Sequence, residues 1–139
     1  RMFAMADALP AVLPRDQIVL QTALLPVAQS AAFVADLSQA LDLWPLWFCP
    51  VRNFGPPGPI FSVPADGGEL YVAVGAYGVP KNGVEYGEDN QELEMAMLRR
   101  GGRKVHHSVS FYPIELFYAS VYNGNAYAAL REKYHAEGV

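Results

Sequence analysis

Apolar and polar residues alternate along this chain with a period that changes from segment to segment. Residues 17–26, QIVLQTALLP, and 69–78, ELYVAVGAYG, are rich in β-branched and aromatic residues and predict strands. Apolar residues of 27–41 recur at spacings of three and four, which predicts a helix with one buried side. Residues 43–51, LWPLWFCPV, predict another strand, and its two prolines confine it to a sheet edge or to element ends.

The second half of the chain continues with a helix, a strand and two more helices. Asp89 or Asn90 is expected to cap a helix that ends before a pair of glycines at 101–102. Its apolar side would be Leu93, Ala96 and Met97. Residues 103–112, RKVHHSVSFY, predict the fourth strand, and residues 114–122 and 125–138 predict the closing helices. A short helix over 2–9 and two turn-rich loops over 53–69 and 79–89 complete the prediction.

The order strand, helix, strand, strand, helix, strand predicts an α+β fold. Its simplest packing is the ferredoxin-like arrangement, a four-stranded antiparallel sheet (β-α-β-β-α-β) with helices on one face and appended C-terminal helices. We expect one domain over 17–139, preceded by a lead-in segment over 1–16.

Alternation separates the two faces of this sheet. The aliphatic set around Val72 and Val74 suits the helix layer, with Leu46 and Phe48 on the same side. The open face would carry Trp47, Cys49, Tyr71, Ala73, Gly75 and Tyr77 from the second and third strands. From the first strand it would carry Gln17, Val19, Gln21 and Ala23. From the fourth strand it would carry either Lys104, His106, Ser108 and Ser110, or the other alternating set, which begins with His107. Such a mixture of rings, small residues and polar groups suits a ligand wall, and an interface with another domain or chain is the alternative.

Composition excludes several classes of function. Ten basic and fourteen acidic side chains give a net charge of −4, so no nucleic acid partner is expected. The single cysteine cannot form an internal disulfide, and no His or Cys spacing predicts a metal site. The long uncharged run over 17–35 is interrupted by polar residues and Pro26, so no transmembrane segment is predicted.

The chemically capable residues each have a simple structural explanation. Cys49 has no base beside it, so packing explains it better than nucleophilic catalysis. His106 and His107 would point to opposite faces of a regular strand, so only one of them would face the site. The acidic residues from Glu85 to Glu94 are expected to be a solvated helix start. No motif in the chain supplies a cofactor site on its own.

Four segments carry a resemblance to a known family. They read QTALLPVAQSAAFVADLSQAL (21–41), DLWPLWFCPVR (42–52), GELYVAVGAYGVP (68–80) and ELFYASVYNGNAYAALREKYHAEG (115–138). Together they resemble, in the same order, the C-terminal part of the Δ24-sterol reductase (diminuto/seladin-like) family, FAD-linked oxidoreductases of the vanillyl-alcohol oxidase superfamily. The chain departs from the family's pattern at residues 107–109 and at Tyr118.

The resemblance implies a substrate cap whose FAD-binding domain lies elsewhere, in cis or in trans. FAD would transfer hydride to a C=C bond of a sterol-like substrate, and NADPH would be the electron donor. Residues implied to face flavin and substrate are Trp47, Cys49, Tyr71, Gly75, Tyr77 and His107, with His107 and Tyr77 as candidate proton donors. The alternative is a non-catalytic accessory subunit of a larger assembly. The compartment stays open, an organellar or membrane-associated assembly included.

Overall fold

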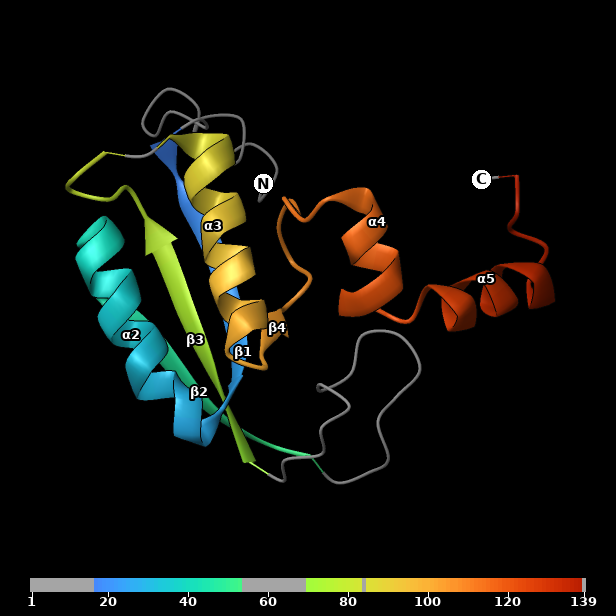
Figure 1. The fold of residues 1–139 in the computed structure, drawn as a ribbon, viewed down its shortest axis with the longest axis horizontal. Coiled ribbons are helices and arrows are strands. Elements are labelled where there is room, and N and C mark those ends of the chain that lie inside the picture. Colours follow the sequence, from blue (N-terminus) through green and yellow to red (C-terminus); the bar gives the residue numbers. More distant parts are fainter. Residues whose placement is uncertain (1–16, 54–69, 84, 139) are drawn as a thin grey trace, which may run out of the picture.

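The computed structural model describes residues 17–53, 70–83 and 85–138 (Figure 1). Four strands form one sheet in the order β2-β3-β1-β4. They are β1 (Val19–Pro26), β2 (Leu46–Arg52), β3 (Leu70–Gly78) and β4 (Arg103–Lys104), and every neighbouring pair is antiparallel. The predicted α+β, ferredoxin-like arrangement is confirmed. The expected helix at 2–9 and most of the loop at 53–69 lie outside the described residues.

Two helices cover one face of the sheet. Helix α2 (Val27–Leu41) has the predicted bounds, and it buries Phe33, Leu37 and Leu41, which recur every fourth residue. Helix α3 (Tyr86–Arg99) lies beside it and buries Leu93 and Met97 (Figure 1). These side chains pack on β1 and β3 to form the largest apolar core. That core fixes which sheet face remains open.

Helix α3 begins earlier than the sequence predicted. It starts at Tyr86, and the backbone N–H of Glu85 donates to the side chain of Asp89 at 2.7 Å. Asn90 is therefore not a cap but a buried residue within the helix. The other end is as expected, because the helix ends at Arg99 and Gly101 follows in the left-handed region with φ 67°.

The C-terminal region leaves the sheet beyond β4. Helix α4 (Ile114–Leu116) continues into a π-helical turn, η3 (Phe117–Val121), and then α5 (Gly124–Lys133). Tyr112, Val121 and Tyr122 form a separate buried cluster against α3. Helix α5 has no buried residue and extends away from the sheet (Figure 1).

The face of β1 was assigned wrongly from the sequence. Val19, Gln21 and Ala23 face the helices, because their partners in β3 are Gly78, Ala76 and Val74. Thr22 and Leu24 lie on the open face instead, and Gln17 precedes the strand. The interpretation of β2 and β3 agrees with the pairing, since Trp47 lies opposite Gly75 and Cys49 opposite Ala73.

The fourth strand is much shorter than predicted. Only Arg103 and Lys104 pair with β1, and the chain then follows an irregular path to Tyr112. Lys104 is buried and faces the helix layer. Because the strand ends at Lys104, neither of the two alternating sets predicted for the open face exists. This irregular path brings both histidines to one side of the sheet.

Candidate functional site: a hollow on the open face of the sheet

The open face of the sheet contains a hollow with a volume of about 770 Å³. Its floor is apolar and comes from three adjacent strands, through Leu24, Cys49, Val51 and Ala73. Trp47, Tyr77 and Thr22 also line it, and the remaining wall comes from residues 103–107 and Tyr122. An apolar floor with a few polar groups at its side is the usual composition of a small-molecule site.

One side of the hollow carries a hydrogen-bonded group of three side chains. The Tyr77 hydroxyl lies 2.5 Å from Thr22 Oγ1, and His107 Nε2 lies 3.3 Å from the same atom. The Tyr77 and His107 rings meet edge to face with centroids 5.9 Å apart. Two side chains predicted from the sequence to face the site, Tyr77 and His107, therefore converge on Thr22, which the sequence pattern did not indicate.

Glycine at position 75 is required by the place of the Tyr77 ring. A Cβ atom built on Gly75 would lie 2.6 Å from the Tyr77 hydroxyl and 2.7 Å from two ring carbons. The register pairs Gly75 with Thr22 across the two strands. Absence of a side chain at Gly75 thus lets the tyrosine ring fold back along its own strand toward the threonine.

His106 and Tyr122 form another part of the wall of the hollow. The His106 ring stacks on Tyr122, with centroids 4.7 Å apart and an interplanar angle of 27°. The Tyr122 hydroxyl donates to the Lys104 carbonyl at 2.8 Å, and burial raises the pKa of Tyr122 to about 12. Burial and the nearby charge of Lys104 lower the pKa of His106. Neutral His106 is favoured, so it contributes a ring surface to the site.

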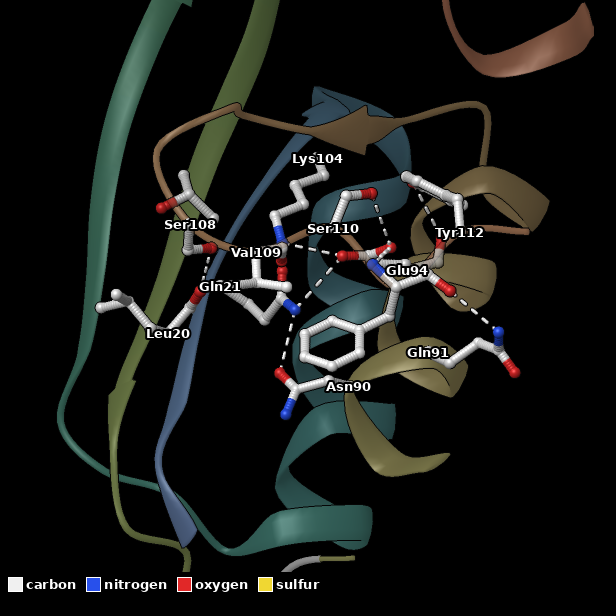
Figure 2. Close-up of polar contacts among 12 residues, drawn as sticks. Leu20, Gln21, Asn90, Gln91, Glu94, Lys104, Ser108, Val109, Ser110 and Tyr112 are labelled. Carbon is white, nitrogen blue, oxygen red and sulfur yellow. Dashed lines mark hydrogen bonds and ion pairs between the residues drawn. The ribbon is translucent and has the colours of Figure 1, made fainter. Parts of the chain in front are cut away.

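A buried ion pair on the helix side determines the path of the histidine segment (Figure 2). Lys104 Nζ donates to Glu94 Oε1 at 2.8 Å, and both side chains are 0% exposed. The other carboxylate oxygen accepts from the backbone N–H of Phe111 at 2.8 Å and from the Ser110 hydroxyl at 3.4 Å. Burial lowers the pKa of Lys104, while Glu94 opposes this effect. The expectation that Glu94 belongs to a solvated helix start is therefore wrong.

Further contacts fix the same segment at both ends. Lys104 also donates to the Val109 carbonyl, which draws the chain back toward β4 (Figure 2). The backbone N–H of Val105 donates to the Thr22 carbonyl at 2.8 Å. The Ser108 hydroxyl donates to the Leu20 carbonyl at 2.5 Å. Since these contacts prevent a regular strand after Lys104, the expected opposite orientation of the two histidines is wrong.

The network continues along β1 and α3. Gln21 Nε2 donates to Asn90 Oδ1 at 2.9 Å and lies 3.4 Å from Glu94 Oε1. Gln21 Oε1 is buried and has no hydrogen-bond partner in the described part of the chain. This polar network explains why Gln21 points toward the helices rather than toward the open face.

The six residues implied to face flavin and substrate share the open face but differ in access to the hollow. Trp47, Cys49, Tyr77 and His107 line it. Tyr71 is only 1% exposed, packs with Leu24 and Ala73, and does not line the hollow. Gly75 acts through the space that it leaves for Tyr77. Thr22 and His106 are the additions, and neither could be placed without the long-range pairing.

Two negative findings concern the described residues. They contain no group of three or more His, Cys, Asp or Glu side chains arranged to hold a metal ion. None of the helices within the described ranges has the length and apolar character needed to span a bilayer.

Comparison with known proteins gives one distant relative. The chain is 25% identical over 140 residues to the Delta(24)-sterol reductase of Arabidopsis thaliana. The alignment covers 88% of this chain but only 25% of that protein, so the chain spans about a quarter of the relative's length. No family model matches the chain. No solved structure matches it either. The similarity indicates a distant relation to part of a sterol reductase.

Proposed function

We propose that this chain is the substrate-covering part of an FAD-dependent reductase that acts on a C=C bond of a sterol-like molecule. The observation that carries the proposal is the hollow on the open face, with its apolar floor and its polar group at Tyr77, Thr22 and His107. The distant similarity to a sterol reductase supports the same reaction class.

The residues of the hollow fit one side of a flavin and substrate site. Leu24, Cys49 and Ala73 offer a smooth apolar surface, as a sterol body or the ring system of a flavin requires. Trp47 is 49% exposed and offers a large ring for stacking. The described residues supply one side of such a site, and we assign the facing side to the FAD-binding domain or to a partner chain.

The start of helix α3 does not suit the phosphates of a dinucleotide. The first turn of α3 carries Glu88 and Asp89, whose negative charges repel an anion at that helix start. We assign the phosphates of FAD to an FAD-binding domain in cis or in trans, since this chain covers only 25% of the sterol reductase to which it is similar. The binding of NADPH as electron donor belongs to that part as well.

When bound, the flavin supplies the hydride for the reduction. The residues of this chain would cover the reacting carbon, exclude water and orient the substrate along the apolar floor. Reduction of a C=C bond also needs a proton, and a positioned side chain delivers it faster than solvent. Tyr77 and His107 are the candidate donors, because both reach the hollow from its polar side.

The test uses the full-length polypeptide that contains this chain, together with any FAD-binding partner. We expect bound flavin and NADPH-dependent reduction of a sterol side-chain alkene. Trp47→Ala should lower kcat/KM for the sterol about tenfold, since losing a ring contact costs about 1.4 kcal/mol. Trp44→Ala is the matched control, because Trp44 is similarly exposed at 50% but does not line the hollow.

Two results would contradict the proposal. A polypeptide that carries no flavin and reduces no sterol would favour the accessory-subunit alternative, in which the open face is a protein interface. Equal losses in the Trp44→Ala and Trp47→Ala variants would show that the hollow has no particular part in substrate binding.

A further inference from the structure

Thr22 joins the two candidate proton donors of the hollow. It is buried, with 3% of its surface exposed, whereas Tyr77 is 42% exposed and His107 is also accessible. Its hydroxyl lies 2.5 Å from the Tyr77 oxygen and 3.3 Å from His107 Nε2. The three side chains come from β3, β1 and the segment after β4, so only the folded sheet brings them together.

The direction of these hydrogen bonds follows from the other nitrogen of His107. His107 Nδ1 lies 3.1 Å from the Val105 carbonyl oxygen, which can only accept, so Nδ1 carries a proton. In the neutral ring Nε2 is then an acceptor. Thr22 donates to Nε2, and Tyr77 donates to Thr22.

Protonation of His107 reverses the direction of the whole group. In the imidazolium form Nε2 donates to Thr22, and the Thr22 hydroxyl donates to the Tyr77 oxygen. The Tyr77 proton then has no partner within the group and turns toward the hollow. The protonated form thus presents an O–H donor to whatever occupies the apolar floor.

We propose that Thr22 is the positioning residue of a proton relay from His107 to Tyr77, which delivers one proton into the hollow. This inference rests on the proposed function and deepens it. The Tyr77 O–H bond breaks as the second C–H bond of the reduced alkene forms. The Thr22 proton passes to the Tyr77 oxygen, and the His107 Nε2 proton passes to Thr22. The imidazolium becomes neutral, and water reprotonates it from the exposed side.

Other ionisable groups surround His107 and must be separated from it in any pH measurement. Tyr77 approaches from β3, Cys49 lies across the floor on β2, and Arg103 comes from β4. His106 stacks on Tyr122 in the wall of the hollow, while Lys104 is bound to Glu94. Histidine is the side chain that normally changes charge near neutral pH, so His106→Gln provides the comparison.

A structural role for Thr22 is distinguished from the relay by two substitutions of similar size. Thr22→Val keeps the shape and removes the hydroxyl, whereas Thr22→Ser keeps the hydroxyl. In the reductase we expect Thr22→Val to lower kcat about 100-fold with little change in KM, as for loss of general acid catalysis. Thr22→Ser should stay within about threefold of the wild type because the donor remains.

The pH profile gives the readout that a structural role would not change. The pH dependence of kcat should be weaker in Thr22→Val and in His107→Gln than in the wild type, and should match the wild type in Thr22→Ser and in His106→Gln. Wild-type rate and pH profile in Thr22→Val would overturn the relay while leaving the proposed function intact.

Nitrogen spectra of histidine labelled with ¹⁵N test the same geometry without catalysis. His107, assigned by the signal lost in His107→Gln, should be protonated on Nδ1 in its neutral form, and its Nε2 signal should shift in Thr22→Val. A neutral His107 protonated on Nε2 would overturn the relay. A wild-type polypeptide that reduces no sterol overturns the proposed function. The spectra then test only whether Tyr77, Thr22 and His107 form the hydrogen bonds described above.

Discussion

The buried ion pair between Glu94 and Lys104 gives a direct test of the structure. Glu94→Gln keeps the size of the side chain but removes its charge, which leaves the Lys104 ammonium without a counterion inside the protein. Both side chains are 0% exposed and Nζ lies 2.8 Å from Oε1, so little solvent screening is expected. Removing one partner of a buried pair costs about 3–5 kcal/mol.

Urea unfolding of the chain measures this cost, and a double-mutant cycle isolates the pair. Glu94→Gln and Lys104→Met should each lower the free energy of unfolding by about 3–5 kcal/mol. The double variant should lose less than the sum, because neither charge is then buried alone. Glu92→Gln is the matched control: its partner Arg99 is 56% exposed and Glu92 67%, so the loss should be below about 1 kcal/mol.

The reasoning is refuted if Glu94→Gln loses no more than the Glu92→Gln control. Such a result would mean that water reaches Lys104, and that the pair does not fix the path of residues 105–112. A loss in both single variants that is fully additive would likewise show that the two side chains do not interact.

Three further predictions concern close packing and pH. Gly102→Ala should cost about 1–3 kcal/mol in urea unfolding, because its Cβ would lie 2.6 Å from the Leu24 carbonyl oxygen. Gly75→Ala should change stability by less than about 1 kcal/mol, since the Tyr77 ring can move away. It should nevertheless abolish the Tyr77–Thr22 contact, seen as a changed Tyr77 hydroxyl signal by NMR; an unchanged signal would contradict the packing. Burial raises the pKa of Tyr122 from 10.0 to about 12, so the folded state holds a proton that the unfolded state releases. Stability present below pH 10 should fall by up to about 3 kcal/mol towards pH 12, and Tyr122→Phe should show a smaller fall in alkaline unfolding curves.

Local patterns predicted most of the sheet and its helix layer. The alternation in β3 and the spacing of three and four between apolar residues of 27–41 depend on residues close in sequence, and the strand and the helix both lie where they were expected. The two prolines of the aromatic run indicated an edge strand, and β2 is at the edge. These features need no knowledge of distant contacts.

The errors arise where distant polar residues decide the structure. Gln21 and Thr22 are both polar, and the pattern alone could not choose which of them faces the helices. Asn90 and Glu94, about seventy residues later, hold Gln21 inside. The alternating residues after Lys104 were typical of a strand, but the bonds from Lys104 and Glu94 to residues 109–111 turn the chain back.

The same distant contacts explain why the candidate site was only partly predicted. Trp47, Cys49 and Tyr77 were found from alternation within their own strands. Thr22 and the joint position of His106 and His107 required the pairing of β1 with β3 and the buried ion pair.

The most direct test of the account is the rate at which a maleimide alkylates Cys49 in the full-length polypeptide, followed by peptide mass spectrometry. Cys49 is half-buried on the floor of the hollow, so a ligand there should shield it. The account predicts that alkylation is slow with flavin and sterol bound and faster when either is removed. An unchanged rate would contradict the claim that this face covers flavin and substrate.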